Sequence, residues 1–337
     1  MKKAFALMLC VMMVAALFVG CDAGNATTGD SLKTGMAIIS STAKSKDAEE
    51  EDGAGQVDSV VVAVTVDKDN KIVNCFIDTA QTVISFSADG TITADANAEI
   101  KTKQEKKEEY GMKRISGIGK EWYEQANALA KYVEGKTVNQ VKGIKVDESG
   151  YPSEADLTSS VTMNIAGYIS AIEKAVENAT DLGAKKGDKL GVGVVTDLGR
   201  TADATDEDEG LAQAYSHYAA VTVNSDGKIT SCIIDASQTG VYFDASGKIT
   251  SDKNDTHKTK QELGDAYGMK GNSGIGKEWN EQANAFGKYV VGKTASEVSG
   301  IAVDENAKPT SSDLTTSVTV SIDGMIAAVE KAVANAK

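Results

Sequence analysis

The sequence predicts an α+β fold built from two copies of one domain, and three observations support this prediction. The segment Lys101–Glu105 recurs as Lys258–Glu262, and Ser116–Trp122 recurs as Ser273–Trp279, in both cases 157 residues later. Within each copy, strand-like runs come before segments of helical periodicity, which is the order typical of α+β domains. A period of this length indicates whole domains, because the units of solenoid proteins run about 20 to 50 residues.

The two copies are expected to divide the chain near 181–189, a Gly- and Lys-containing stretch that follows a predicted helix. Repeat one then spans residues 33–182 and repeat two spans 188–337. About 300 residues remain after the N-terminal segment, which suffices for two domains of ordinary size. Duplication also implies that a site present in one repeat is present in the other.

The first half of repeat one predicts an antiparallel meander of strands with one covered face. An acidic loop at 46–56 separates the first two strand-like runs, and the turn at 67–70 precedes the third. A further hairpin is expected around the turn 88–90. The predicted strands are 35–41, 57–66, 71–78, 83–86 and 91–93.

Two amphipathic helices are expected after the strands. The first ends at Gly135, which suits a helix C-cap, and the last runs from about 164 to 178. The apolar stripes that predict them are Ile118, Trp122, Ala126, Leu129 and Val133, and Ile165, Ile169, Ile172 and Val176.

Residues 1–20 are typical of an export signal, because two lysines precede an apolar run over 4–19. The run is too short for a comfortable transmembrane helix of about 20 residues. Gly20 followed by Cys21 resembles the lipobox of bacterial lipoproteins, in which the cysteine thiol receives a diacylglycerol. We therefore expect a signal peptide, a lipidated Cys21, a polar leash over 21–32 and a location on the outer face of the cytoplasmic membrane. The alternative is an ordinary secretory signal that is cleaved near Gly20.

The chain is acidic, with a formal net charge of −14 that becomes −16 when Lys2 and Lys3 leave with the signal. Such a surface repels phosphate backbones, so nucleic acid is excluded as a partner. Cys75 and Cys232 stand at matching positions in apolar strands. They are expected to be buried hydrophobic residues and imply no disulfide framework.

A hydroxyl-rich segment precedes the last helix of each repeat, at Asp156–Thr162 and Asp313–Thr319. One interpretation is that these hydroxyls cap the helix. The segments also resemble the flavinylation sequon of FMN-binding domains, Asp-x-x-Ser/Thr-Gly/Ser-Ala-Thr, whose last Thr carries FMN through a phosphoester. Ser160 and Ser317 stand where Gly is commoner, and Val replaces Ala in both. Because the pattern occurs twice at matching positions, we favour the flavin hypothesis over capping.

The resemblance covers nearly the whole mature chain and includes the segment Gly119–Gln125. It is closest to the tandem flavinylated lipoproteins of Gram-positive extracellular electron transfer, including the peptide-pheromone-encoding lipoprotein family. It implies that a flavin transferase, using FAD and a divalent metal, places FMN on Thr162 and Thr319. Asp156, Ser160, Asp313 and Ser317 would then belong to the flavinylation motif.

The same resemblance implies a redox carrier rather than an enzyme, which relays electrons from a membrane donor to an external acceptor. A phosphoester at a helix N-terminus would place phosphate oxygens near unpaired backbone N–H groups. A covalent link would also keep the cofactor from being lost by dilution outside the cell, because occupancy otherwise follows free concentration relative to Kd.

Large side chains next to the repeated glycines are candidate flavin contacts, since a flavin ring needs flat, apolar walls. These are Tyr110 and Met112 in repeat one and Tyr267 and Met269 in repeat two. For Trp122 and Trp279, on apolar helical stripes, we favour a place in the core.

Other repeated or charged patterns have plainer explanations that we favour. The lysines at 101, 103, 113, 258, 260 and 270 are expected to be solvated surface residues, although they could meet a phosphate or a flavin. The acidic runs at 49–52 and 206–209 lack the ligand spacing of a calcium loop. His217 and His257 have no counterparts in repeat one and receive no role.

Two other functions stay open at this point. A non-redox surface lipoprotein could bind a small ligand or a cell-wall partner through two equivalent clefts. Independently of either function, the cleaved signal could yield a signalling peptide.

Overall fold

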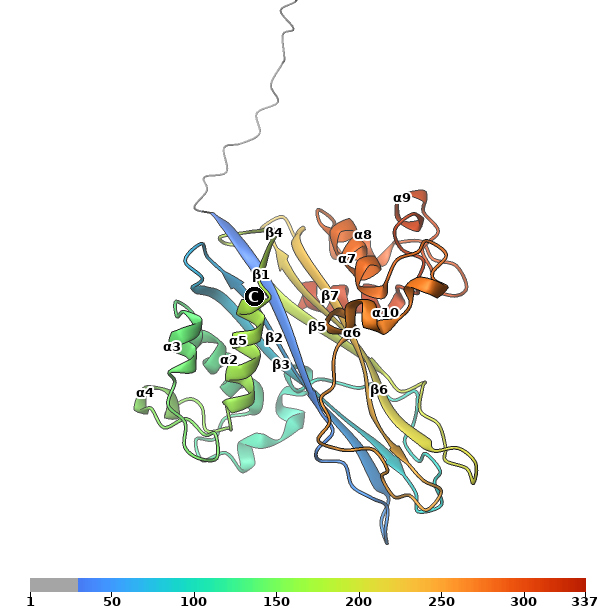
Figure 1. Cartoon of the computed structure of the whole chain (residues 1–337). Helices are drawn as coiled ribbons and strands as arrows, with labels where there is room; N and C mark the ends of the chain where they lie inside the picture. Colours follow the sequence, from blue (N-terminus) through green and yellow to red (C-terminus); the bar gives the residue numbers. More distant parts are fainter. Residues whose placement is uncertain (1–29) are drawn as a thin grey trace, which may run out of the picture.

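The computed structural model describes residues 30–337 and shows two packed β-sheets with helices on their outer sides (Figure 1). The predicted signal peptide, Cys21 and most of the predicted leash lie outside the described residues. The leash was predicted to extend to residue 32, but strand β1 begins at Ser31 and Leu32 is buried. Residues 31 and 32 therefore belong to the sheet.

Each repeat forms its own antiparallel sheet. The strand order is β3-β2-β1-β4 in the first sheet and β5-β6-β7 in the second. The strands are β1 (Ser31–Ser41), β2 (Gly53–Val66), β3 (Ile72–Phe86), β4 (Thr180–Lys185), β5 (Lys189–Asp197), β6 (Gly210–Val223) and β7 (Ile229–Phe243). The predicted α+β class is confirmed.

The strands are longer and fewer than the sequence predicts. Residues 71–78 and 83–86 were expected as separate strands, but β3 runs through both, and β2 extends into the predicted acidic loop. The expected hairpin at 91–93 is reduced to an isolated bridge between Phe86 and Ile92. The continuous strand is favoured because β2 and β3 remain paired from Gly53 opposite Phe86 to Val66 opposite Ile72.

Both faces of each sheet are buried, which corrects the prediction of one covered face. In β2, Val62 and Val64 pack against the helices of repeat one, whereas Val61 and Ala63 pack against the other sheet. Alternate side chains of a strand point to opposite faces, so a run of valines can fill two cores. The repeats thus form a sandwich of two sheets with helices outside.

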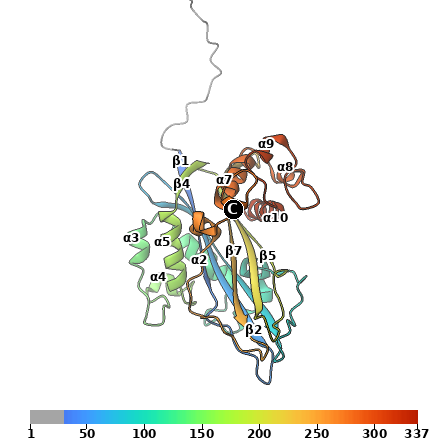
Figure 2. The same cartoon turned by 45° about the vertical axis from the view of Figure 1, so that its right-hand side comes forward.

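The helices of each repeat cover the outer face of its sheet (Figures 1 and 2). In repeat one they are α1 (Lys103–Lys106), α2 (Trp122–Val133), α3 (Val138–Lys142), α4 (Ala155–Thr158) and α5 (Ala166–Glu177), with short 3₁₀ turns η1 (Lys107–Tyr110) and η2 (Met112–Arg114). In repeat two they are α6 (Lys260–Leu263), α7 (Trp279–Val290), α8 (Ala295–Ser299), α9 (Ser312–Thr315) and α10 (Asp323–Ala334), with 3₁₀ turns η3 (Gly264–Tyr267) and η4 (Lys270–Asn272). The first predicted helix was expected to include Ile118, but α2 begins at Trp122.

Contacts between the repeats are reciprocal, as in a two-fold arrangement. Lys174 pairs with Glu262, and the equivalent Lys331 pairs with Glu105. The backbone N–H of Ile92 donates to Asp203 Oδ1 at 2.7 Å, and that of Ile249 donates to Asp47 Oδ1 at 2.9 Å. Equivalent residues therefore meet equivalent partners across a pseudo-two-fold axis.

The predicted boundary between the repeats is partly a strand. β4 follows α5 directly and pairs with β1, with Thr34 opposite Thr180. Only the short turn between Lys185 and Lys189 then leads into β5. The connection is thus built into the first sheet rather than left as a free linker.

The two cysteines of the described region are free and buried, as predicted. Burial raises the pKa of the Cys75 and Cys232 thiols, so the thiolate is disfavoured. Across residues 30–337, no helix combines the length and apolar character needed to cross a membrane.

Candidate functional site

The two predicted attachment threonines are held in the same way. Thr162 lies between α4 and α5, where its backbone N–H donates to Gln125 Oε1 at 2.8 Å and its Oγ1 lies 3.3 Å from that oxygen. Thr319 makes the same contacts to Gln282 Oε1 at 2.8 and 3.3 Å. Both threonines are half-buried. Each hydroxyl is therefore fixed near the surface by a glutamine amide, from α2 in repeat one and from α7 in repeat two.

Neither threonine opens the helix that comes after it. The N-caps of α5 and α10 are Ile165 and Ile322, and neither helix has a side-chain capping bond. Thr162 and Thr319 each lie three residues before the cap. The capping interpretation is therefore wrong, and so is the expectation that the threonine oxygen sits at the helix N-terminus.

The glutamines that hold the threonines are fully buried and use both ends of their amides. Gln125 Nε2 donates to Ser116 Oγ at 3.0 Å and to the Lys120 carbonyl at 3.2 Å. No role was predicted for Gln125 and Gln282 from the sequence. A signal was present, because a polar Gln recurs 157 residues later on an otherwise apolar helical stripe.

The remaining motif residues sit on the short helices α4 and α9 or directly after them. Asp156 and Asp313 are exposed. Ser160 Oγ donates to the Leu157 carbonyl at 3.2 Å, and Ser317 repeats this contact at 3.1 Å. Buried leucine and valine side chains fasten each segment to the core, so the acid and the threonine are presented together at the surface: Leu157, Val161, Leu314 and Val318.

The candidate ring-contact residues lie beside the same helix. Tyr110 and Met112 are half-buried and pack against the core of repeat one. The buried Glu121, at the start of α2, accepts the Met112 N–H at 2.8 Å. Glu278 holds Met269 in the same way at 2.9 Å. Since Glu121 and Gln125 stand one turn apart at the start of α2, they bring these side chains and the threonine to one end of the repeat.

Trp122 and Trp279 are core residues, as predicted, with 3% and 4% of their surface exposed. Each has a lysine ammonium over its ring, from Lys103 at 5.5 Å and from Lys260 at 5.2 Å. The surface assignment is wrong for Lys260, which is only 3% exposed. Its Nζ lies 4.4, 4.7 and 5.2 Å from the ring centroids of Tyr215, Tyr267 and Trp279, so the ammonium group itself is enclosed by aromatic rings.

The lysine environments differ between the repeats. Lys260 Nζ donates to Tyr215 Oη at 2.8 Å, and Arg200 lies over the same ring at 5.1 Å. In repeat one the position of Tyr215 is taken by Asp58, which pairs with Lys44 at 2.7 Å. The second repeat therefore has an additional aromatic wall, and the first has an ion pair.

Burial controls the charges of Lys260 and His217 in repeat two. Desolvation, reinforced by nearby Arg200, lowers the pKa of Lys260 to about 7. Desolvation, with Lys260 next in importance, lowers the pKa of His217 to about 4. Near neutral pH, the histidine is therefore neutral and the lysine is divided between its two forms.

The loop that contacts the glutamine beside each threonine has open space around its glycines. The glycines of the loop that contacts Gln125 have open space around them, because a Cβ built on Gly117 or Gly119 meets nothing within 4 Å. The equivalent Gly274 and Gly276 are also open. Each repeat thus combines a hydroxyl, a buried amide that orients it, an open glycine-containing loop and half-buried apolar side chains. Within residues 30–337, no group of three or more His, Cys, Asp and Glu residues is arranged to hold a metal.

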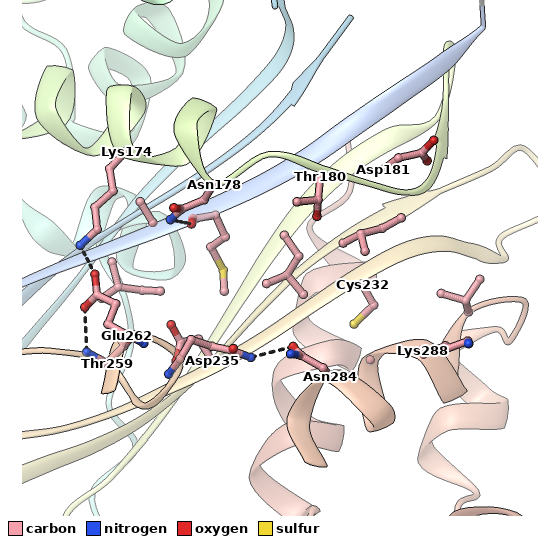
Figure 3. A pocket seen from close by; sticks show the side chains of 18 residues that line it. Lys174, Asn178, Thr180, Asp181, Cys232, Asp235, Thr259, Glu262, Asn284 and Lys288 are labelled. Atoms are coloured by element: carbon pink, nitrogen blue, oxygen red, sulfur yellow. Dashed lines mark hydrogen bonds and ion pairs between the residues drawn. The ribbon is translucent and has the colours of Figure 1, made fainter. Parts of the chain in front are cut away.

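A cavity of about 960 Å³ lies elsewhere, between the repeats (Figure 3). It is bounded by β1, α5 and β4 of repeat one and by β7, α6 and α7 of repeat two. Neither predicted attachment threonine lines it. The cavity is therefore a feature separate from the two threonine sites.

Comparisons with known proteins give one short similarity. No family model matches this chain, and no solved structure matches it. A chlorophenol reductase from Desulfitobacterium hafniense is 56% identical over 41 residues, which are 12% of this chain and 12% of the reductase. The chain thus spans about an eighth of that protein's length, and a segment this short shows neither a shared family nor a shared activity.

Proposed function

We propose that this protein is an extracytoplasmic electron carrier with one FMN esterified to Thr162 and one to Thr319. The observation that carries the proposal is the duplicated arrangement in which a buried Gln amide orients the threonine of a sequon-like segment. A purely structural hydroxyl would not require the exposed Asp six residues before it in both repeats. The flavin supplies the redox chemistry, and the protein supplies attachment, orientation and electrostatics.

Each part of the site has a role in this proposal. Gln125 and Gln282 would hold the backbone and the hydroxyl of each half-buried threonine in one position for the transferase. Asp156 and Asp313, being exposed, are available for recognition by that enzyme. Tyr110, Met112 and their equivalents would shield one face of the ring from water. Lys260 would place positive charge beside the second flavin.

The positions of the two sites support a relay with separate contacts. The helices α4 and α9, which carry the two motifs, lie on opposite sides of the sandwich in both views (Figures 1 and 2). One repeat could thus accept electrons from a membrane donor while the other delivers them to an external acceptor. Anchoring through Cys21 to the outer face of the membrane would keep the carrier close to that donor.

Intact mass spectrometry tests attachment directly. Exported protein, produced with an active flavin transferase, FAD and a divalent metal, should gain the mass of two FMN groups less two waters. Thr162→Ala and Thr319→Ala should each remove one adduct. Thr158→Ala and Thr315→Ala are matched controls in the same segments and should retain both. Unmodified wild-type polypeptide under these conditions would overturn the proposal.

A second candidate is a non-redox binding lipoprotein, and the 960 Å³ cavity between the repeats favours it. Cavities of this size are typical of small-molecule sites. A colourless protein that binds a ligand in this cavity would support this candidate over the electron carrier.

A further inference from the structure

The cavity between the repeats has a counterpart on the other side of the pseudo-two-fold axis. Asn178 Nδ2 donates to the Met36 carbonyl at 3.0 Å beside the cavity, and the equivalent Asn335 Nδ2 donates to the Val192 carbonyl at 2.9 Å. The two sides therefore have the same framework. They differ in the residue that stands two positions after each asparagine.

On the second side, a lysine side chain occupies the equivalent position. Lys337 Nζ donates to Asn127 Oδ1 at 2.7 Å and lies 4.8 Å from the centre of the Phe76 ring. The buried Asp78 attracts this ammonium group electrostatically. The protein thus contains its own example of an alkylammonium group bound between the repeats.

On the cavity side, the polar groups are kept, but no lysine stands at the position equivalent to Lys337. Thr180 takes the position of Lys337 and pairs in β4 with Thr34. Asn284 and Asp235 are the equivalents of Asn127 and Asp78, and both line the cavity (Figure 3). Asn127 Oδ1 accepts hydrogen bonds from Gln104 and Lys337, whereas the exposed Asn284 accepts one from Gln261 at 2.9 Å. Asn284 therefore has acceptor capacity for a further donor.

The charges and walls of the cavity suit a cation on an apolar stem. Glu262 already pairs with Lys174 at one end, and Lys288 lies towards the other end (Figure 3). Asp235, a residue that is 5% exposed, lies between them (Figure 3). Apolar side chains form much of the remaining wall: Met36, Ile38, Ile233 and Val291.

We propose that this cavity binds the ammonium group of a small primary alkylamine, with Asn284 and Asp235 as the recognition pair. The ligand lies beside Ile233, the equivalent of Phe76, over whose ring the Lys337 ammonium group lies on the other side. This site is independent of the flavin sites and of the proposed redox function.

Calorimetric titration of the intact protein with n-pentylamine and 1,5-diaminopentane tests the site, with 1-pentanol as the uncharged control. Both amines should bind at one site per chain, and pentanol should bind at least about tenfold more weakly, because it lacks the charged donor. Equal binding of pentanol, or no binding of either amine, would overturn the proposal.

Three variants locate the binding. Asn284→Ala and Asp235→Asn should each weaken amine binding about tenfold or more, as expected for loss of a contact to a charged group. Lys337→Ala should raise the stoichiometry from one to two, because it frees the equivalent position next to Asn127. Thr162→Ala with Thr319→Ala should leave amine binding unchanged, which separates this result from that of flavin attachment.

Thermal unfolding would identify a variant that had lost its fold. Because Asn284 is exposed, its replacement is less disruptive to the fold than that of the buried Asp235. Unchanged binding in Asn284→Ala and in Asp235→Asn would place the amine elsewhere and overturn the assignment.

Discussion

The rings of Phe86 and Phe243 stack with their centroids 4.1 Å apart and their planes within 5° of parallel. They are equivalent residues at the ends of β3 and β7, and both are fully buried. Each repeat thus contributes the same side chain to one contact at the pseudo-two-fold axis.

Replacing either ring should weaken the whole molecule rather than one repeat. We expect Phe86→Ala and Phe243→Ala each to lower the free energy of unfolding by about 3 to 5 kcal/mol, measured by urea denaturation. The double variant should show a coupling of about 0.5 to 1.5 kcal/mol, because the rings contact each other. Tyr242→Ala, at a position 47% exposed, is the neighbouring control. Strict additivity of the two losses would contradict a direct contact between the rings.

The glutamines should control the modification of their own repeat. In a Thr319→Ala background, where only repeat one can be modified, Gln125→Ala should lower the fraction carrying FMN, because the Thr162 N–H loses its acceptor. The buried unpaired group should also lower stability by about 1 to 3 kcal/mol. Gln104→Ala is the control, since this glutamine supports Ile77 and not the threonine. Intact mass measures the adduct, and equal adduct fractions in the two variants would remove the positioning role.

His217 and Gly324 provide a test in which one repeat is the control for the other. A Cβ on Gly324 would lie 2.4 Å from His217 Cδ2, whereas one on the equivalent Gly167 meets nothing within 4 Å. Gly167→Ala should therefore stabilise by about 0.5 to 1 kcal/mol, and Gly324→Ala should destabilise. Val60 is the equivalent of His217 in repeat one. Adding His217→Val should therefore restore the thermal stability that Gly324→Ala loses. Failure of this rescue would refute the steric explanation.

Lys260 should make stability depend on pH in the alkaline range. Its folded pKa is lowered to about 7, while the unfolded value is about 10.4, so between these values the unfolded state binds the additional proton. The free energy of unfolding should therefore rise with pH over this window, by up to about 1.4 kcal/mol per unit. This rise of the free energy of unfolding with pH should be absent in Lys260→Met. It should also be absent in Lys260→Arg, because the guanidinium keeps its proton. Urea unfolding at about pH 7 and about pH 9 measures the slope, and an unchanged slope in both variants would contradict the assignment.

If both threonines carry flavin, the two cofactors should differ in reduction potential. The buried Lys260 and nearby Arg200 favour the more negative, reduced form in repeat two. Lys260→Met should lower the potential of that flavin by on the order of 30 mV, equivalent to about 1.4 kcal/mol for a two-electron couple. Spectroelectrochemical titration in a Thr162→Ala background isolates this flavin. Since the lysine loses its charge as pH rises through 7, the effect should be larger at lower pH.

The sequence was sufficient for the parts of the fold that periodicity determines. The helical stripe through Leu129 is buried as predicted, whereas Ile169 and Val176 of the last predicted stripe are only half-buried. The repeat length correctly indicated that each half has its own sheet. The sequence was not sufficient for features set by contact between the repeats. The valine run in β2 could not reveal that its second face packs against another sheet, because periodicity does not identify the partner.

The sequence predicted only part of the candidate site, because it reveals local patterns but not contacts between residues that are distant in the chain. The threonines and their motif are local patterns, so sequence located them. Gln125 meets Thr162 across 37 residues of chain, and Lys260 meets Tyr215 across 45, so only the folded structure brings these pairs together. The cavity beside Asn284 lies at an interface between repeats and has no local pattern at all.

The reciprocal pairs Lys174–Glu262 and Lys331–Glu105 preserve, in one polypeptide, an arrangement that two identical chains would form by symmetric dimerisation. In such a dimer, every substitution would appear twice and the two halves would stay alike. Joining the halves through β4 removes that constraint. Repeat two has Tyr215 where repeat one has Asp58, and Lys337 where repeat one has Thr180. Two identical chains could not differ from each other in this way.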